Sequence, residues 1–202
     1  MRLNEFYRKL LDIGLPAFKT TDIAVLCKIS NQHASQLLIR LAQTKQVMQI
    51  KRGVWILPEK TQALQLPYFL TMPLPSYISL QSALYYHGMI MQIPEIVYAI
   101  SIARTSSHQS GLASVSIHHI SPELFFGYEE KSSYLNMATP EKALFDFLYL
   151  NQTRSRKFAK LPELELTDQF DKALIMKYIE MIPSPNRRQR VKHLLTDLLD
   201  KI

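Results

Sequence analysis

The 202 residues include 24 Lys or Arg and 17 Asp or Glu, so the formal net charge is +7 and the isoelectric point is about 9.4. Hydrophobic residues make up 47% and charged residues 20%, which is typical of a folded globular protein and excludes a disordered chain. The single cysteine, Cys27, excludes an internal disulfide and a zinc site built from several cysteines.

The sequence also predicts where the protein acts. No run of eighteen apolar residues occurs, so we expect no transmembrane helix. The N-terminal segment alternates charged and apolar residues, so we expect no signal peptide. A cytoplasmic location fits these features and the low cysteine content.

The positive charge is concentrated at the two ends of the chain. Residues 1–60 contain ten Lys or Arg and four Asp or Glu, residues 61–150 contain three and six, and residues 151–202 contain eleven and seven. A basic segment often binds a polyanion such as nucleic acid, although it can also be a solvated surface.

The first 28 residues predict two helices. Apolar residues recur at helical spacing from Arg2 to Ile13, and Gly14 ends this helix. A second helix follows, capped by Thr20 or Thr21. Its expected buried stripe is Ile23, Leu26 and Cys27.

A third helix is predicted over residues 31–43, with Ser30 as its N-cap. Its core face is expected to consist of Ala34, Leu37, Leu38 and Leu41. The opposite face has no acidic residue and carries Asn31, Gln32, Ser35, Gln36, Arg40 and Gln43. Amide and guanidinium groups can pair with base edges and phosphates, so this face favours DNA binding over a polar face without a partner.

Two short strands are predicted between Val47 and Leu57, joined by a basic turn, Lys51-Arg52-Gly53. A hairpin directly after three helices is typical of a winged helix-turn-helix, whose tip contacts phosphates. Lys51 and Arg52 are the candidate contacts, together with Lys19 and Thr20 at the start of the second helix. The hairpin could instead only close the core, where we expect Trp55.

The predicted fold class is α+β, with an N-terminal winged helix-turn-helix domain followed by a mixed α/β C-terminal domain. We expect a DNA-binding domain over residues 1–60, a connector over 61–78 and a second domain over 79–202. The connector contains prolines and is expected to be partly extended and to pack through its apolar residues Leu66, Tyr68, Phe69 and Leu70.

The second domain is predicted to combine helices and strands. The helices are expected over 79–88, 139–150, 168–181 and 187–202, with Ser79 and Thr139 as caps of the first two. Strands are expected over 95–103 and 113–120, and two short strands before 139. A loop is expected over 105–111 and a basic loop after 150.

The sequence lacks the usual signatures of enzymes. It contains no glycine-rich phosphate loop and no His-Glu-x-x-His motif. His118 and His119 are adjacent on a predicted strand and should face opposite sides. Glu141 and Asp146 should lie on different faces of one helix, with Glu141 and Lys142 in a capping arrangement. We therefore expect no catalytic residues, no cofactor and no metal site.

A second group of basic residues lies near the C-terminus: Arg154, Arg156, Lys157, Lys160, Arg187, Arg188 and Arg190, with Lys192 beside them. These residues could add phosphate contacts or dock an acidic or RNA partner. They could equally form a solvated surface, and the spacing does not decide between these possibilities.

Three segments resemble a known family: FKTTDIAVLCKISNQHASQLLIRLAQTKQVMQIKRGVWIL, PSYISLQSALYYHGMIMQIPEIVYAIS and MATPEKALFDFLYL. In this order they resemble the AbiEi family of antitoxins from type IV toxin–antitoxin systems. The last segment is similar to that family's Ala-x-Pro-Glu-Lys/Arg-Ala-x-x-Asp motif. The chain departs from the family at Thr44-Lys45-Gln46, where glycine is common, and at Trp55, where tyrosine is common.

The resemblance implies a role in phage defence. It implies an N-terminal domain that binds double-stranded DNA at inverted repeats in its own promoter and represses its operon. The C-terminal domain is implied to counteract a nucleotidyltransferase-like toxin, without necessarily contacting it. The alternative is a winged-helix transcriptional regulator with a C-terminal ligand-binding or oligomerisation domain.

Overall fold

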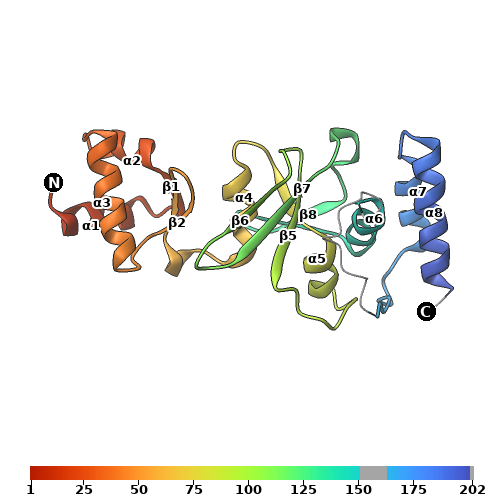
Figure 1. Ribbon diagram of the computed structural model, residues 1–202. Helices are drawn as coiled ribbons and strands as arrows, with labels where there is room; N and C mark the ends of the chain where they lie inside the picture. Colours follow the sequence, from red (N-terminus) through yellow and green to blue (C-terminus); the bar gives the residue numbers. More distant parts are fainter. Residues whose placement is uncertain (151–162, 201–202) are drawn as a thin grey trace.

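The computed structural model describes residues 1–150 and 163–200, which form a mixed α and β fold. The molecule is elongated, with the N-terminal helices at one end, a large sheet in the middle and the last two helices at the other end (Figure 1). The first and last helices are therefore far apart along the long axis.

Residues 1–57, here called the N-terminal unit, contain three helices and a small antiparallel sheet in the order β1-β3-β2. Its elements are α1 (Leu3–Ile13), β1 (Ala17–Lys19), α2 (Thr20–Leu26), α3 (Asn31–Gln43), β2 (Met48–Lys51) and β3 (Val54–Ile56). All three predicted helices and the hairpin are confirmed, whereas the sequence does not predict β1.

The core of the N-terminal unit joins the buried face of α3 to one face of the small sheet. The predicted core residues of α3 are all buried, and Trp55 packs in the same cluster as Leu37 and Leu38. Ser30 caps α3 as predicted, because its hydroxyl oxygen accepts a hydrogen bond from the His33 N–H at 3.2 Å. The exposed face of α3 consequently points away from the sheet.

Two predictions for α2 are wrong. Neither threonine caps the helix, because Thr20 and Thr21 both lie within α2 and Lys19 occupies the N-cap position. Leu26 is 60% exposed rather than buried, and Ala24 joins Ile23 and Cys27 in the core instead.

Residues 61–78 are more regular than the partly extended connector that the prolines predict. After two short 3-10 turns, Pro58–Lys60 and Ala63–Gln65, the chain forms helix α4 (Leu66–Thr71) and strand β4 (Ser76–Ile78). Strand β4 pairs with β5 on one side and β9 on the other, so the central sheet already begins within this segment.

The central sheet has the strand order β6-β7-β5-β4-β9-β8. Its remaining strands are β5 (Ile96–Ser101), β6 (Ser106–Gln109), β7 (Ser114–His119), β8 (Tyr128–Ser132) and β9 (Leu135–Ala138), with a 3-10 turn at Pro122–Leu124. Parallel pairing joins β4 to β9 and β5 to β7. The predicted loop over 105–111 is wrong, because β6 pairs with β7 there.

The remaining helices are α5 (Leu80–Tyr86), α6 (Pro140–Leu150), α7 (Lys172–Glu180) and α8 (Pro185–Leu199). Helices α5 and α6 pack together beside the sheet, and α7 and α8 lie beyond α6 (Figure 1). Helix α7 begins later than predicted, because the Asp171 carboxylate accepts the Ala173 and Leu174 N–H groups as its N-cap.

A hydrophobic cluster, here called the seam, joins the two parts of the molecule. It consists of Ile50, Ile56, Leu66, Phe69, Leu70, Val115 and Ile117, contributed by the small sheet, α4 and β7. The second face of the small sheet is therefore covered by α4 and the central sheet. None of the helices within the described ranges is long and apolar enough to cross a bilayer.

Candidate nucleic-acid interface

The outward face of α3 carries the polar side chains that the sequence singled out. Asn31, Gln32, Gln36 and Arg40 are exposed, and Ser35 is half-buried. With the apolar face held against the sheet, these amide and guanidinium groups are free to meet a partner from outside. Helix α3 contains no acidic residue that would repel a phosphate.

Ile39, which was not among the predicted contacts, also belongs to this outward face. It is 50% exposed, and helical spacing places it between Gln32, Gln36 and Gln43. An apolar side chain among amides can contact the methyl group of thymine, which is part of the major-groove pattern. The sequence does contain this signal, because position 39 is not one of the core positions 34, 37, 38 and 41 and therefore lies on the opposite side of the helix.

The hairpin tip lies directly beside the start of α2. Gly53 has a φ of 74°, which a glycine adopts without strain, and its carbonyl accepts the Thr20 N–H at 3.0 Å. Lys19 and Lys51 both pair with Val54, one from each side, so the two lysines flank it on one sheet face. Arg52 follows in the turn, so three cations gather at this edge.

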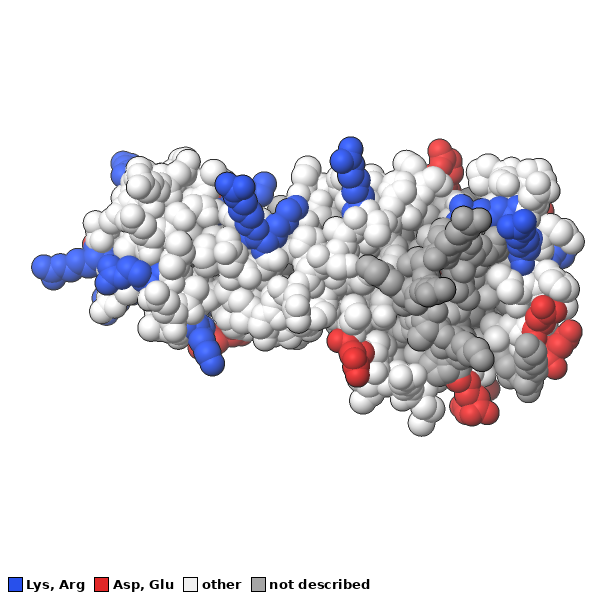
Figure 2. Space-filling view, viewed as in Figure 1, with Lys and Arg blue, Asp and Glu red and all other residues white. Residues whose placement is uncertain are grey.

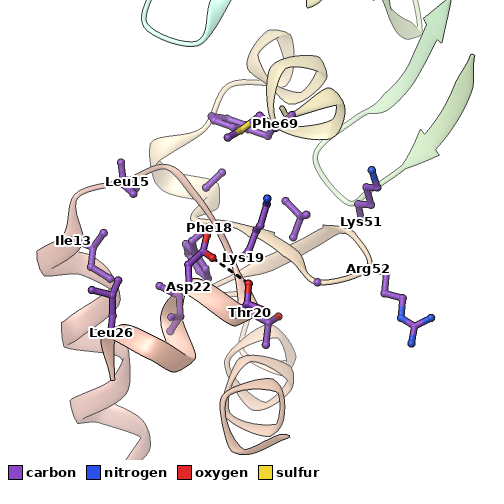
Figure 3. A pocket seen from close by; sticks show the side chains of 16 residues that line it. Ile13, Leu15, Phe18, Lys19, Thr20, Asp22, Leu26, Lys51, Arg52 and Phe69 are labelled. Carbon is purple, nitrogen blue, oxygen red and sulfur yellow. Dashed lines mark hydrogen bonds between the residues drawn. The ribbon is translucent and has the colours of Figure 1, made fainter. Parts of the chain in front are cut away.

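The two cations of the tip have different surroundings. The Lys51 ammonium donates a hydrogen bond to the Leu70 carbonyl at the end of α4, at 3.3 Å. Arg52 extends outward from the turn, away from α4 (Figure 3). Of the two predicted phosphate contacts, Arg52 is therefore the freer one, and Lys51 also ties the hairpin to α4.

The charges at this edge are not neutralised by neighbouring side chains. None of the ion pairs found within residues 1–150 and 163–200 involves Lys19, Arg40, Lys51 or Arg52. Lys and Arg side chains project from the N-terminal unit, while most of the acidic side chains in view lie over the other half of the molecule (Figure 2). The arrangement is suited to attract a polyanion.

Thr20 has a structural partner. Its hydroxyl oxygen accepts a hydrogen bond from the Trp55 indole N–H at 2.9 Å, and this contact fixes Trp55 in the core. The hydroxyl proton of Thr20 can still be donated, so a phosphate contact remains compatible with this geometry.

The second basic group is only partly free. The Arg187 guanidinium stacks on the Tyr149 ring at 3.6 Å from its centroid and donates to the Tyr149 carbonyl. Arg188 donates to the Ile182 carbonyl and pairs with Glu180 at 3.3 Å. Both arginines thus hold α7 and α8 in place, and Arg190 remains exposed. Arg154, Arg156, Lys157 and Lys160 lie outside the described residues.

A buried polar cluster, missed from the sequence, lies between α6 and the central sheet. The Lys142 ammonium pairs with one oxygen of the Asp146 carboxylate at 2.5 Å, and both side chains are 0% exposed. The other oxygen accepts the hydroxyls of Tyr77 and Ser79 at 3.0 and 2.8 Å. Burial raises the pKa of Asp146 and lowers the pKa of Lys142, and the contact between them opposes both shifts.

This cluster replaces two expected arrangements. Lys142 does not act as a capping neighbour of Glu141, because its ammonium turns inward to Asp146 and the Leu124 carbonyl. Ser79 does not cap α5 through its side chain, because its hydroxyl is used by Asp146. Complete burial favours a structural role for the ion pair.

The histidines are separate from one another. His118 is buried and contacts the Ser116 hydroxyl, whereas His119 is exposed, so adjacent positions face opposite sides as predicted. His108 lies in β6, where burial and the nearby Lys51 charge hold its pKa below the usual value. In the part of the chain that the structure describes, no group of three His, Cys, Asp or Glu residues is placed to bind a metal.

Comparison with known proteins assigns no family. No protein-family model matches the sequence. A search of curated proteins likewise finds none with significant similarity. The geometry of the N-terminal unit and the sequence motifs therefore remain the indications of function.

Proposed function

We propose that the N-terminal unit is a winged helix-turn-helix that binds double-stranded DNA. The observation that carries the proposal is the outward face of α3, which is rich in amides, free of acids and held in place by its buried stripe. In this geometry α3 enters the major groove, and Gln32, Gln36 and Ile39 meet base edges. Arg52 and Lys19 contact the phosphate backbone beside the groove.

We further propose that the protein is an autoregulating antitoxin of a type IV toxin–antitoxin system. The support is the resemblance of residues 75–101 and 137–150 to AbiEi antitoxins. The operator would be an inverted repeat upstream of its own gene, and the opposed toxin a nucleotidyltransferase-like protein encoded beside it. We propose a binding function rather than an enzyme, because the exposed amides of α3 and the cations of the hairpin tip are groups suited to binding a polyanion.

The proposal is tested by fluorescence anisotropy with the duplex from upstream of the gene and a shuffled duplex, at two salt concentrations. The wild-type protein should prefer the upstream duplex, and Gln36→Ala should reduce that preference by about 5- to 150-fold, because a bidentate base contact contributes about 1–3 kcal/mol. Gln92→Ala, at an exposed glutamine outside the N-terminal unit, is the matched control. Equal binding of both duplexes by the wild type would contradict the proposal.

The antitoxin role has its own test. The neighbouring nucleotidyltransferase-like gene is expressed alone and together with the full chain, and growth is recorded. Recovery of growth only with the full chain supports antitoxicity. Growth arrest that persists despite specific DNA binding leaves a transcriptional regulator and excludes the antitoxin role.

A further inference from the structure

A cavity of about 540 Å³ opens between the N-terminal unit and α4. Its walls come from the end of α1, from β1 and α2, from the hairpin tip and from α4 (Figure 3). Small-molecule sites in proteins typically measure roughly 300–1,000 Å³ and often lie where two parts of a fold meet. The size and position of this cavity fit that class.

The interior of the cavity is apolar. Leu15, Leu26 and Met72 line it and remain 45%, 60% and 47% exposed, although each is a large hydrophobic side chain. Phe18 and Phe69 lie behind them and are buried. Several exposed apolar side chains around one cavity indicate a binding surface more often than single scattered ones do. A ligand that covers them removes apolar area from water, which favours binding.

The rim of the cavity is cationic. Lys19 and Lys51 flank Val54, and Arg52 follows Lys51, so three positive side chains border one side of the opening. Among the described residues that line the cavity, Asp22 is the only acidic one, and its carboxylate accepts a hydrogen bond from the Thr21 hydroxyl. The cavity thus combines an apolar interior with an excess of positive charge at its edge.

We propose that this cavity binds a small monoanionic amphiphile, such as a medium-chain carboxylate. Its hydrocarbon part covers Leu15, Leu26 and Met72, and its carboxylate lies against Lys19 and Lys51. A neutral hydrocarbon leaves the cations unpaired, and a simple anion leaves the apolar interior wet. Only a ligand with both parts matches the whole lining.

Binding there has a regulatory consequence, which rests on the proposed DNA-binding function. Lys19 and Arg52 border the cavity and are also the proposed phosphate contacts. A carboxylate at the rim neutralises part of the charge that attracts DNA, so ligand and DNA binding should oppose each other. The cavity would then act as an effector site in the N-terminal unit.

The experiment uses the full chain without DNA, so that it can fail independently of the DNA-binding proposal. Binding of 8-anilinonaphthalene-1-sulfonate, an aromatic monoanion, is followed by fluorescence, and decanoate, decanol and acetate are compared as competitors below their aggregation limits. Decanoate should compete at least about tenfold better than decanol, the equivalent of about 1.4 kcal/mol, and acetate should not compete. Equal competition by decanoate and decanol overturns the assignment of the rim.

Two neighbouring substitutions locate the site. Leu26→Glu places a carboxylate in the cavity and should weaken decanoate binding by about tenfold or more, because like charges repel. Val25→Glu is the matched control, since Val25 is on the same helix, is 77% exposed and does not line the cavity. Equal effects of the two substitutions, or decanoate-induced amide chemical shifts confined to regions away from α2 and α4, overturn the proposal.

A last measurement repeats the DNA titration with saturating decanoate. A weaker DNA affinity supports opposition between the two ligands. An unchanged DNA affinity with proven decanoate binding excludes the regulatory consequence and leaves the site itself intact.

Discussion

At the scale of single residues, the most informative contrast is between the two cations of the hairpin tip. Lys51 is bonded to the Leu70 carbonyl, whereas Arg52 extends into solvent. The sequence does not distinguish them, because both belong to the predicted turn, whereas Lys51 is the last residue of β2. The structure separates a cation that is partly used within the fold from one that is available to a phosphate.

This contrast predicts different salt dependences of DNA binding. Each phosphate contact contributes about 0.9 to the slope of log K against log salt, so Arg52→Gln and Lys19→Gln should each lower the slope by about 1. Lys51→Gln should lower it less. The measurement is anisotropy titration over a salt series, with the exposed Lys177→Gln on α7 as control. A slope unaffected by Arg52→Gln would remove the hairpin from the interface.

His108 gives a prediction about pH. Burial and the Lys51 charge lower its pKa in the folded protein, so the fold binds this proton more weakly than the unfolded chain does. The resulting stability is fully present above the unfolded pKa of about 6.5 and is lost as the pH falls through the lower folded pKa. Urea midpoints at about pH 7.5 and about pH 5.0 should therefore differ less in His108→Gln than in the wild type. The same pH dependence in both proteins would exclude this role for His108.

At the scale of elements, α6 shows which features the local sequence predicts and which it does not. The sequence predicts the helix and its Thr139 cap, and the hydroxyl oxygen of Thr139 accepts the Lys142 N–H at 3.3 Å. It does not predict the burial of the charged residues. The partners of Asp146 in the fold include Tyr77 and Ser79, which are 69 and 67 positions away. Contacts over such separations cannot be predicted from a local sequence pattern.

The buried ion pair of α6 predicts an asymmetric mutational response. Asp146→Asn should reduce the free energy of unfolding by about 3–5 kcal/mol, because it leaves the Lys142 charge buried without its counter-ion. The double substitution Lys142→Met with Asp146→Leu should recover part of that loss, since no buried charge remains. Urea unfolding measures both.

The exposed pair of Lys131 and Glu129 provides the control for that measurement. Glu129→Gln should change stability little, because solvent screens both charges. A loss for Asp146→Asn no larger than for Glu129→Gln would show that the α6 pair does not stabilise the fold.

Helix α3 and strand β6 show the same difference between features set by local sequence and features set by distant contacts. The sequence predicts helix α3 with its cap, its bounds and its buried stripe, because all three signals are local. It does not predict strand β6, since Ser-Ser-His-Gln contains no strand-favouring residue and its extended form is set by pairing with β7. In the candidate site, helical periodicity predicts the outward face of α3. The alignment of Lys19, Val54 and Lys51 across the small sheet depends on β1, which no local sequence pattern predicts.

At the scale of the whole molecule, the seam makes the two parts mechanically continuous. Ile56 of the small sheet packs in one cluster with Leu66 of α4 and Ile117 of the central sheet. No flexible linker separates the hairpin from α4, so we expect that a ligand which displaces the hairpin also displaces α4. The sequence predicts a partly extended connector over residues 61–78 and its packing, but not the helix and strand that it forms.

The position of β4 determines how the protein can be divided. A fragment that begins at residue 79 lacks the strand between β5 and β9, so the central sheet separates into a three-stranded and a two-stranded piece. We expect a fragment of residues 79–202 to be unfolded by circular dichroism, and one of residues 62–202 to retain the sheet. A well-folded 79–202 fragment would contradict this.

Genetic tests of the proposed antitoxin role are affected in the same way. A truncation at residue 79 that abolishes protection against a toxin would report the collapse of a sheet rather than the loss of a DNA-binding domain. Protection should be assigned to the C-terminal part only with fragments that keep Ser76–Ile78. The three residues of β4 are thus the smallest segment whose inclusion decides whether the two proposed activities can be studied apart.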